Sequence, residues 1–426
     1  MLFDRQGEKK YMVGMDLRDE ACQISWCRSQ KGRLLQEPVT YARVPGSGKF
    51  DIPMALCKTA GENQWFYGEE AVEHSAEENR IFIPRLLSLA LDGSPVAIDE
   101  TEYDPAALLA LYVNRCLQEL EQGIPGGIAA VMFTARTMDS RTIELLENVR
   151  KRLDLKASVY YQSFAGSFYD FMLNQDESLR EPAAALFDYE TGGRLRVTKL
   201  IFNPHTTPVV SYLEENEYPG LFAKDDAGRD REFAGILREE LAGHNFSSVY
   251  LVGSGFKGGW MKKSTVFLCQ GRRAFLGGNL FSKGAAYGAV FKEEKPEILS
   301  RYLFLDQNKL RSNILMKALD RGELARISLV DAGVNWYEVR SSADVILDST
   351  AEINLILHPL TGGKEEPFHI RLDRLPVREG RMTRVRLEFS MLSAIKLHIQ
   401  IEDLGFGEIF PSSGLKWEQD LTLADD

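Results

Sequence analysis

Four continuous apolar runs constrain the fold of this chain more than any other feature. They lie at 11–15, 128–135, 183–189 and 248–252. Such runs are typical of strands that are buried on both faces of a sheet. The first run ends at Asp16. The third run contains Asp188 near its end and begins a second half of the domain that is built like the first. The first 296 residues therefore predict an α/β fold.

Helices are predicted between these strands. Residues 104–122 carry an apolar stripe, and Asp104 is placed to cap the start of this helix. Either Asp139 or Ser140 is expected to cap the next helix. A helix of small residues over 282–292 closes this part of the chain, and the charged segment KEEKPE that follows is the expected domain boundary.

The remainder of the chain has a different pattern. Segments such as INLILH, FHIRLD, RVRLEF and KLHIQIED alternate apolar and polar residues. This period of two predicts half-exposed antiparallel strands. We expect a separate β domain over 297–426, with helical segments around residues 308 to 325.

Composition excludes several classes of protein. The chain of 426 residues has a formal net charge of -11, which disfavours broad binding of nucleic acid. Its 5 cysteines are scattered and form no metal-binding spacing. The segment MLFDRQGEKKYMVGM lacks the apolar core of a signal peptide, and no run of about eighteen apolar residues predicts a membrane span. We expect a cytoplasmic protein that binds neither nucleic acid nor membrane.

Two glycine-rich segments resemble phosphate-binding motifs only in part. GSGK (46–49) lacks the first glycine of a P-loop and has Phe50 at the Mg²⁺-binding position, so we expect a hairpin turn. GSGFKGG (253–259) has the glycine spacing of a dinucleotide fingerprint. No acidic residue follows it as far as Lys292, which argues against a dinucleotide site. The glycines still allow a ligand to approach the backbone closely.

Three polar residues at strand ends form the strongest candidate site. Asp16 and Asp188 end the first strands of two similarly built halves, and Gln162 ends a strand between them. In a duplicated fold these side chains would meet in one cleft. The two carboxylates would then hold hydrated Mg²⁺, and the amide would orient an attacking water.

The ordered segments resemble the actin/DnaK-type superfamily of sugar kinases, chaperones and actins. VGMDLRDEACQIS resembles the first phosphate loop, ALFDYETGG the second, VYLVGSGFKGGWM the adenosine loop, and NLFSKGAAYGAVF the closing helix. The resemblance implies a duplicated ribonuclease H-like, actin-like domain with lobes at 1–181 and 182–296. It also implies a C-terminal antiparallel β-sandwich at 297–426, similar to a chaperone peptide-binding domain without its lid.

The same resemblance implies a nucleotide site that binds ATP or ADP with Mg²⁺. Asp16 and Asp188 would hold the metal, and Asp16, Gln162 and Asp188 would be catalytic. The residues implied to contact the nucleotide are Gly14, Arg18, Gly192, Gly193, Gly253, Ser254 and Gly255.

Both phosphate loops depart from the family pattern. Arg18, Asp19 and Glu20 stand where the family has glycine and hydroxyl residues. Carboxylates near a triphosphate repel it by roughly 1 to 4 kcal/mol per close pair of charges. In the second loop Glu190 and Thr191 precede the two glycines, so that loop is also altered.

Three functions follow from this sequence. The first is a hydrolysis-deficient DnaK-like protein, chaperone-like or a scaffold, that binds a protein or peptide through its C-terminal β domain. The second is an active ATP-binding chaperone or actin-like ATPase. The third is a small-molecule kinase of the same superfold, although no base for a substrate hydroxyl can be recognised.

Overall fold

The computed structural model describes residues 11–423 except 349, 361, 362, 377 and 379. Residues 1–10 lie outside the described residues. They include most of the segment MLFDRQGEKKYMVGM, which we predicted not to be a signal peptide. The chain forms two compact units, Met1–Phe304 and Leu305–Asp426. The sequence led us to expect this boundary after residue 296. The architecture is mixed α/β with several sheets, as predicted.

The first sheet of the N-terminal unit has the strand order β11–β10–β1–β2–β3, and β4 also pairs with β2. Strand β1 is parallel to β10 and antiparallel to β2, so its two neighbours run in opposite directions. The strands are β1 (Tyr11–Leu17), β2 (Ala21–Gln30), β3 (Arg33–Thr40), β4 (Ile52–Pro53), β10 (Ile128–Ala135) and β11 (Ser158–Ser163).

The second sheet has the order β16–β15–β12–β13–β14–β17. Strand β12 is parallel to β15 and antiparallel to β13. The five strands from β16 to β14 therefore repeat the order and directions of the five strands from β11 to β3. The strands are β12 (Ala183–Tyr189), β13 (Leu195–Asn203), β14 (Val209–Tyr218), β15 (Ser248–Val252), β16 (Arg273–Leu276) and β17 (Tyr302–Leu305).

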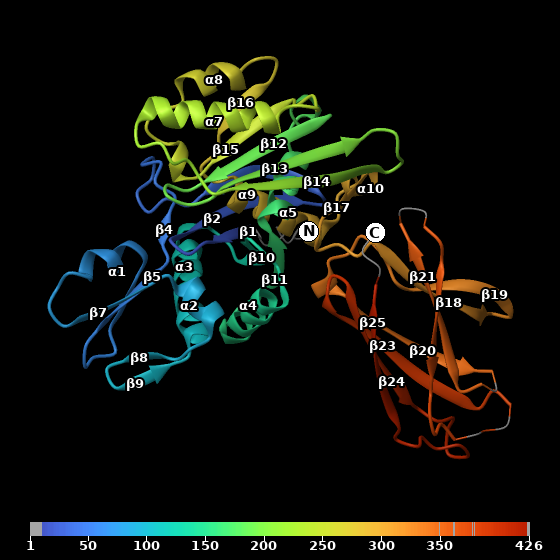
Figure 1. Cartoon of the computed structure of the whole chain (residues 1–426). Coiled ribbons are helices and arrows are strands. Elements are labelled where there is room, and N and C mark those ends of the chain that lie inside the picture. The colour runs from blue at the N-terminus through green and yellow to red at the C-terminus, as the bar shows by residue number, and fades with distance from the viewer. Residues whose placement is uncertain (1–10, 349, 361–362, 377, 379, 424–426) are drawn as a thin grey trace, which may run out of the picture. The chain divides into compact units, whose positions relative to one another are not determined.

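Helix α9 (Leu280–Glu294) packs against both of these sheets (Figure 1). Its alanines contact Met12 and Met132 of the first sheet, while Phe281 belongs to the apolar core of the second. Helix α5 (Phe164–Leu173) lies beside α9 and shares the core of the second sheet. On the opposite face of that sheet lie α7 (Asp226–Glu240) and α8 (Lys262–Leu268).

Two helix caps form as the sequence predicts. The Asp104 carboxylate accepts a hydrogen bond from the Ala106 amide at the start of α3 (Pro105–Gly123). The Asp139 carboxylate accepts one from the Thr142 amide at the start of α4 (Ser140–Arg152). Such caps stabilise a helix by about 1 kcal/mol because they satisfy amides that the first turn leaves unpaired.

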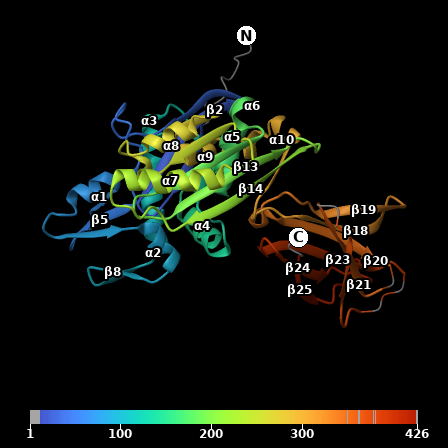
Figure 2. The same cartoon turned by 45° about the horizontal axis from the view of Figure 1, so that its top comes forward.

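Smaller elements complete the N-terminal unit (Figure 2). They are α1 (Gly68–His74), β5 (Ala55–Thr59), β6 (Trp65–Tyr67), β7 (Arg80–Pro84), α2 (Leu86–Asp92), β8 (Val96–Ile98), β9 (Thr101–Tyr103), α6 (Glu177–Arg180), the 3₁₀ turn η1 (Ser254–Phe256) and α10 (Ile298–Arg301). The GSGK segment lies in the loop between β3 and β4, which both pair with β2. The prediction of a hairpin turn there is wrong, because β3 and β4 run in the same direction and pair with successive parts of the same edge of β2, and not with each other.

The C-terminal unit contains two antiparallel sheets, β19–β18–β21–β22 and β20–β23–β24–β25. Buried and exposed residues alternate along β21 and β23, as the period of two predicts. The elements are β18 (Ser312–Asp320), β19 (Glu323–Val330), the 3₁₀ turn η2 (Trp336–Glu338), β20 (Arg340–Leu347), β21 (Glu352–Pro359), β22 (Glu366–Arg371), β23 (Thr383–Ser393), β24 (Lys396–Asp403) and β25 (Lys416–Thr422).

The predicted helical segments around residues 308 to 325 are wrong. This stretch forms most of the hairpin of β18 and β19. Its turn contains Arg321 and Gly322, whose φ angles are 51° and 90°. Consecutive residues with positive φ build a tight hairpin turn and interrupt a right-handed helix. Among the described residues, none of the helices combines the length and the apolar character that crossing a bilayer requires.

Candidate functional site: an arginine-lined cleft

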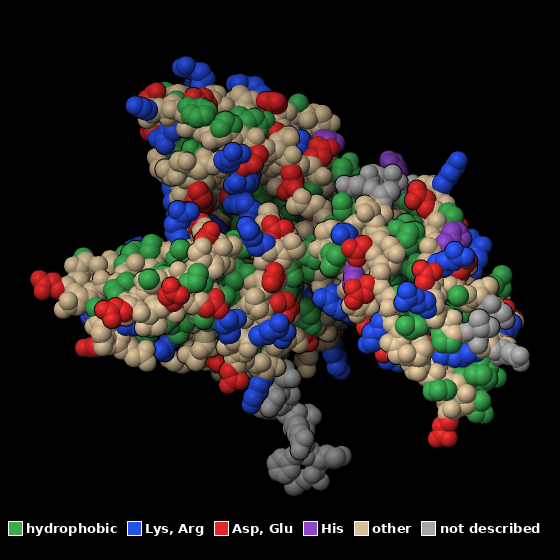
Figure 3. Space-filling model, turned by 60° about the horizontal axis from the view of Figure 1, so that its bottom comes forward, with side chains coloured by type: hydrophobic (Ala, Val, Ile, Leu, Met, Phe, Trp, Pro, Cys, Tyr) green, Lys and Arg blue, Asp and Glu red, His purple; other side chains and the backbone are tan. Residues whose placement is uncertain are grey.

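A cavity of about 380 Å³ lies within the N-terminal unit, where β1 and β12 end. Figure 3 shows a hollow in the surface of this unit, with Lys and Arg side chains gathered beside acidic ones. Residues of both large sheets contribute to the cavity, so it lies between the two repeated arrangements of strands. Its lining includes Leu17, Arg18, Arg136, Asp188, Glu190 and Arg196.

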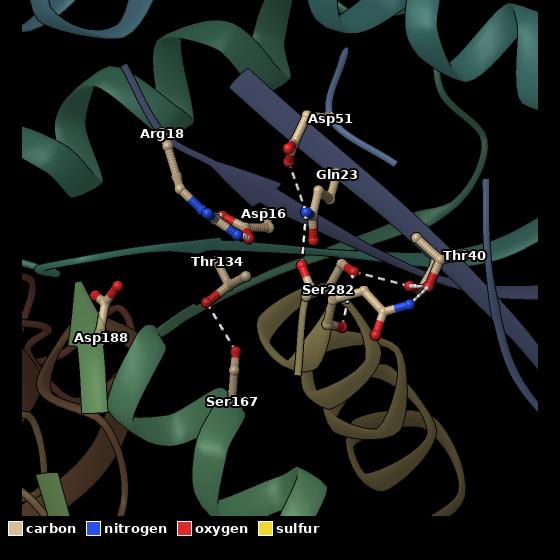
Figure 4. Close-up of polar contacts among 12 residues, drawn as sticks. Asp16, Arg18, Gln23, Thr40, Asp51, Thr134, Ser167, Asp188 and Ser282 are labelled. Carbon is tan, nitrogen blue, oxygen red and sulfur yellow. Dashed lines mark hydrogen bonds and ion pairs between the residues drawn. The ribbon is translucent and has the colours of Figure 1, made fainter. Parts of the chain in front are cut away.

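Asp16 is fully buried beneath Arg18 (Figure 4). The Arg18 Nε donates to both carboxylate oxygens of Asp16, at 3.1 and 3.0 Å, and Nη2 donates to Oδ2 at 2.5 Å. Burial raises the pKa of the Asp16 carboxyl, while the charge and hydrogen bonds of Arg18 oppose this shift. Burial would lower the pKa of Arg18, but the neighbouring carboxylates, that of Asp16 foremost, raise it above its ordinary value.

Arg18 also reaches the second sheet. Its Nη1 donates to Glu190 Oε1 at 3.1 Å. The other oxygen of Glu190 accepts hydrogen bonds from the amide of Ser254 at 2.9 Å and from its hydroxyl at 2.5 Å. Arg18 therefore joins the end of β1 to the loop after β12, and Ser254 holds the receiving carboxylate in place.

A second arginine makes a similar connection. Arg136 follows β10 of the first sheet, and its Nη1 donates to Asp188 Oδ2 at 2.9 Å. Asp188 is buried near the end of β12 of the second sheet. The Asp188 charge also contributes to raising the pKa of Asp16, so the two carboxylates lie close enough to interact. The structure thus brings Asp16, Arg18 and Asp188 together, each aspartate paired with an arginine.

Gln162 lies level with Asp16 in the register of the first sheet, but its side chain has different neighbours. Thr134 stands between them in register, paired with Asp16 on one side and with Gln162 on the other. The Gln162 Nε2 donates to the buried Ser167 hydroxyl at 2.7 Å, and that hydroxyl donates to Thr134 at 2.7 Å. These bonds tie Gln162 to helix α5, and it does not line the cavity.

The predicted nucleotide-contacting glycines mostly pack against the protein itself. A Cβ on Gly14 would lie 2.2 Å from the Ser282 carbonyl oxygen, so this glycine allows α9 to approach β1. A Cβ on Gly253 would lie 2.2 Å from the Tyr189 carbonyl oxygen, and one on Gly255 would meet the Tyr189 ring at 2.2 Å. Gly192 and Gly193 form the turn after β12, where Gly192 has a φ of 76° and Gly193 lines the cavity.

This arrangement does not fit a hydrated magnesium ion. Mg²⁺ requires near-octahedral oxygen ligands, which carboxylates supply directly or through water. The oxygens of Asp16 face a guanidinium group, and an oxygen of Asp188 accepts from another. Within the part of the chain that the structure describes, no group of three or more His, Cys, Asp or Glu side chains is placed to hold a metal ion.

Residues 37–307 match the C-terminal part of a family of unknown function, DUF5716. The chain belongs to the DUF5716 family. Residues 309–423 match a second domain of unknown function, DUF8552. The gap between the two DUF matches falls close to the boundary of the compact units at Phe304 and Leu305. No curated protein matches the chain.

Sequence reasoning missed Arg136 and Arg196 as residues of the cleft. Arg136 directly follows the strand over 128–135, which is parallel to the strand that carries Asp16. The carboxyl ends of parallel strands lie at the same edge of a sheet. The rule that selected Asp16 therefore could have selected Arg136. Arg196 lies opposite Asp188 in the register of β12 and β13, and the sequence alone does not fix this register.

Proposed function

We propose that this chain is a divergent member of the actin/DnaK superfold. Its N-terminal unit would be a duplicated ribonuclease H-like domain, and its C-terminal unit a β-sandwich without a lid. The repeated strand order and directions of the two large sheets support the duplication. The positions of Asp16 and Asp188 near the ends of the corresponding strands β1 and β12 support it further.

Within that superfold, the chain acts as a hydrolysis-deficient, chaperone-like or scaffold protein of the cytoplasm. One observation carries this proposal: Asp16 and Asp188 are each paired with an arginine. A guanidinium group that donates to a carboxylate satisfies the lone pairs and the negative charge of that carboxylate. The carboxylate oxygens are then less available as metal ligands. In addition, Arg18 and Arg136 connect the two large sheets directly through ion pairs with Glu190 and Asp188.

ATP turnover tests this proposal. We expect the purified full chain to release phosphate from Mg²⁺·ATP no faster than its Asp188→Asn variant does. Turnover by the wild-type chain that disappears in Asp188→Asn would overturn the proposal and establish an active ATPase. The Arg150→Gln variant is a suitable control, because Arg150 forms an exposed ion pair with Glu147 on helix α4.

The C-terminal unit is the part that we expect to bind a protein or peptide. Leu319 and Leu324 lie opposite one another in the β18–β19 hairpin and are 54% and 74% exposed. Pairs of exposed apolar side chains on a strand are suited to contact with an unfolded segment or a partner.

Suppression of aggregation tests this binding role. The full chain, without nucleotide, should slow the aggregation of a permanently unfolded reporter protein. The Leu319→Lys/Leu324→Lys variant should slow it less. A wild-type chain without effect, or a variant as effective as the wild type, would contradict a chaperone-like role for this hairpin.

A further inference from the structure

Three arginines of the cleft share two carboxylates. Arg136 donates to Asp188 at 2.9 Å. Arg194 and Arg196 both pair with Glu217, at 3.3 and 2.8 Å. All three arginines line the cavity, whereas Glu217 is on β14 and does not. These three arginines outnumber the two carboxylates that pair with them, although the acidic residues Asp19, Glu20 and Glu190 also line the cavity.

Arg136 and Arg196 come from different sheets and act on each other through their charges. Burial is the main reason that the pKa of Arg196 lies below its ordinary value, and the positive charge of Arg136 is the next. Glu217 and Asp188 oppose this shift without cancelling it. A negative group placed between the two guanidinium groups would relieve their repulsion.

Part of the cavity wall is apolar. Leu17, Leu87, Leu91 and Phe164 contribute to it. The Arg136 guanidinium carbon lies 5.3 Å from the centroid of the Phe164 ring, a cation–π distance that helps to fix the direction of this arginine. A volume of about 380 Å³ is within the range of pockets that bind small organic molecules.

We propose that this cavity binds a small organic dianion of the phosphate monoester type, directly through Arg136 and Arg196 and without a metal ion. Planar guanidinium groups bind phosphate oxygens in a bidentate manner, and the apolar wall receives the organic part of the ligand. Bound in this way, the dianion joins the first sheet to the second. The inference rests on the proposed function and extends it, because a cleft that does not bind Mg²⁺ can still bind an anion through its arginines.

Calorimetric titration of the full chain with phenyl phosphate tests the inference. The experiment is done in EDTA at low salt, and phenol serves as the uncharged control ligand. We expect saturable binding of phenyl phosphate and none of phenol. The affinity should fall at least about tenfold in Arg196→Gln, because a charge-assisted hydrogen bond is lost. Arg150→Gln, which alters an exposed arginine on α4, should leave the affinity unchanged.

A loss of affinity could also result from unfolding of the variant, so a second variant is chosen that should bind more tightly. Glu217→Gln removes the carboxylate that Arg194 and Arg196 share, so phenyl phosphate should bind severalfold more tightly. Absence of binding to the wild-type chain would overturn the inference. So would binding that Arg196→Gln leaves unchanged, that Glu217→Gln fails to strengthen, or that requires Mg²⁺. ATP hydrolysis lost in Asp188→Asn would refute the proposed function alone, since arginine-dependent binding in EDTA would still stand.

Discussion

Replacing Arg18 with methionine should destabilise the N-terminal unit strongly. The side chain of Asp16 is 0% exposed and that of Arg18 is 17% exposed, so their ion pair is largely removed from water. Removing one partner of a buried pair leaves the other charge uncompensated and costs about 3 to 5 kcal/mol. Because Arg18 retains some exposure, we expect a loss near the lower end, about 3 kcal/mol.

The pH dependence of this loss has a defined sign. Burial raises the pKa of Asp16, and Arg18 is the main group that opposes the shift, so removal of Arg18 raises this pKa further. A folded state whose carboxyl has a raised pKa binds more protons than the unfolded state does. Its free energy of unfolding therefore falls as the pH rises from the ordinary aspartate value through the raised one. The Arg18→Met variant should lose more stability at pH 7 than at pH 5.

Urea unfolding of the wild type, Arg18→Met, Asp16→Asn and the double variant measures the coupling. The chain has two compact units, so amide hydrogen exchange in β1 and β12 should accompany the unfolding curves to locate the change. We expect Asp16→Asn/Arg18→Met to be more stable than Arg18→Met alone, and Arg150→Met to change little. An Arg18→Met variant with an unchanged midpoint, or additive effects of the two substitutions, would refute the reasoning.

Three further predictions concern other contacts. Gly14→Val should lower the free energy of unfolding by at least about 1 to 3 kcal/mol, because the added Cβ would overlap the backbone of α9. Gly123→Ala, which has open space around it, should leave the free energy of unfolding nearly unchanged. The urea midpoints of the two variants measure this difference. Asp403→Asn should destabilise the C-terminal unit by about 3 kcal/mol, because the buried Asp403 carboxylate pairs with Arg378 at 2.7 Å. The Arg378 contact, first among several causes, holds the pKa of Asp403 below its ordinary value. The contribution of the Asp403 carboxylate to stability should therefore be full at neutral pH and be lost as the pH falls below about 4. Acid titration of the wild type and the variant would detect this loss. Arg136→Gln should cost less than Arg18→Met in urea unfolding, because Arg136 is 38% exposed and water screens its bond to Asp188.

The strands and helices of the N-terminal unit were largely predictable from the sequence. The apolar run over 128–135 predicts the buried strand β10, and Asp104 and Asp139 predict two helix starts, because these signals are local. The stretch around residues 308 to 325 was mispredicted because the decisive feature is the backbone conformation of Arg321 and Gly322. A pattern of apolar residues does not report that conformation.

The candidate site was predictable only in part. Asp16 and Asp188 were selected because both stand near the ends of apolar strands, and the structure brings them close together. The side chains that pair with them depend on how the two sheets face one another across α9, which local patterns do not encode. The pairing of Glu190 with Arg18 and Ser254 is of this kind, since the three residues lie far apart in the sequence.

Calorimetric titration of the wild-type chain with ATP in excess Mg²⁺ tests the central claim most directly. If Arg18 and Arg136 satisfy the carboxylates of Asp16 and Asp188, ATP should bind no more tightly with Mg²⁺ than in EDTA. Tight binding with one nucleotide per chain that requires Mg²⁺ and is lost in Asp16→Asn would contradict the account.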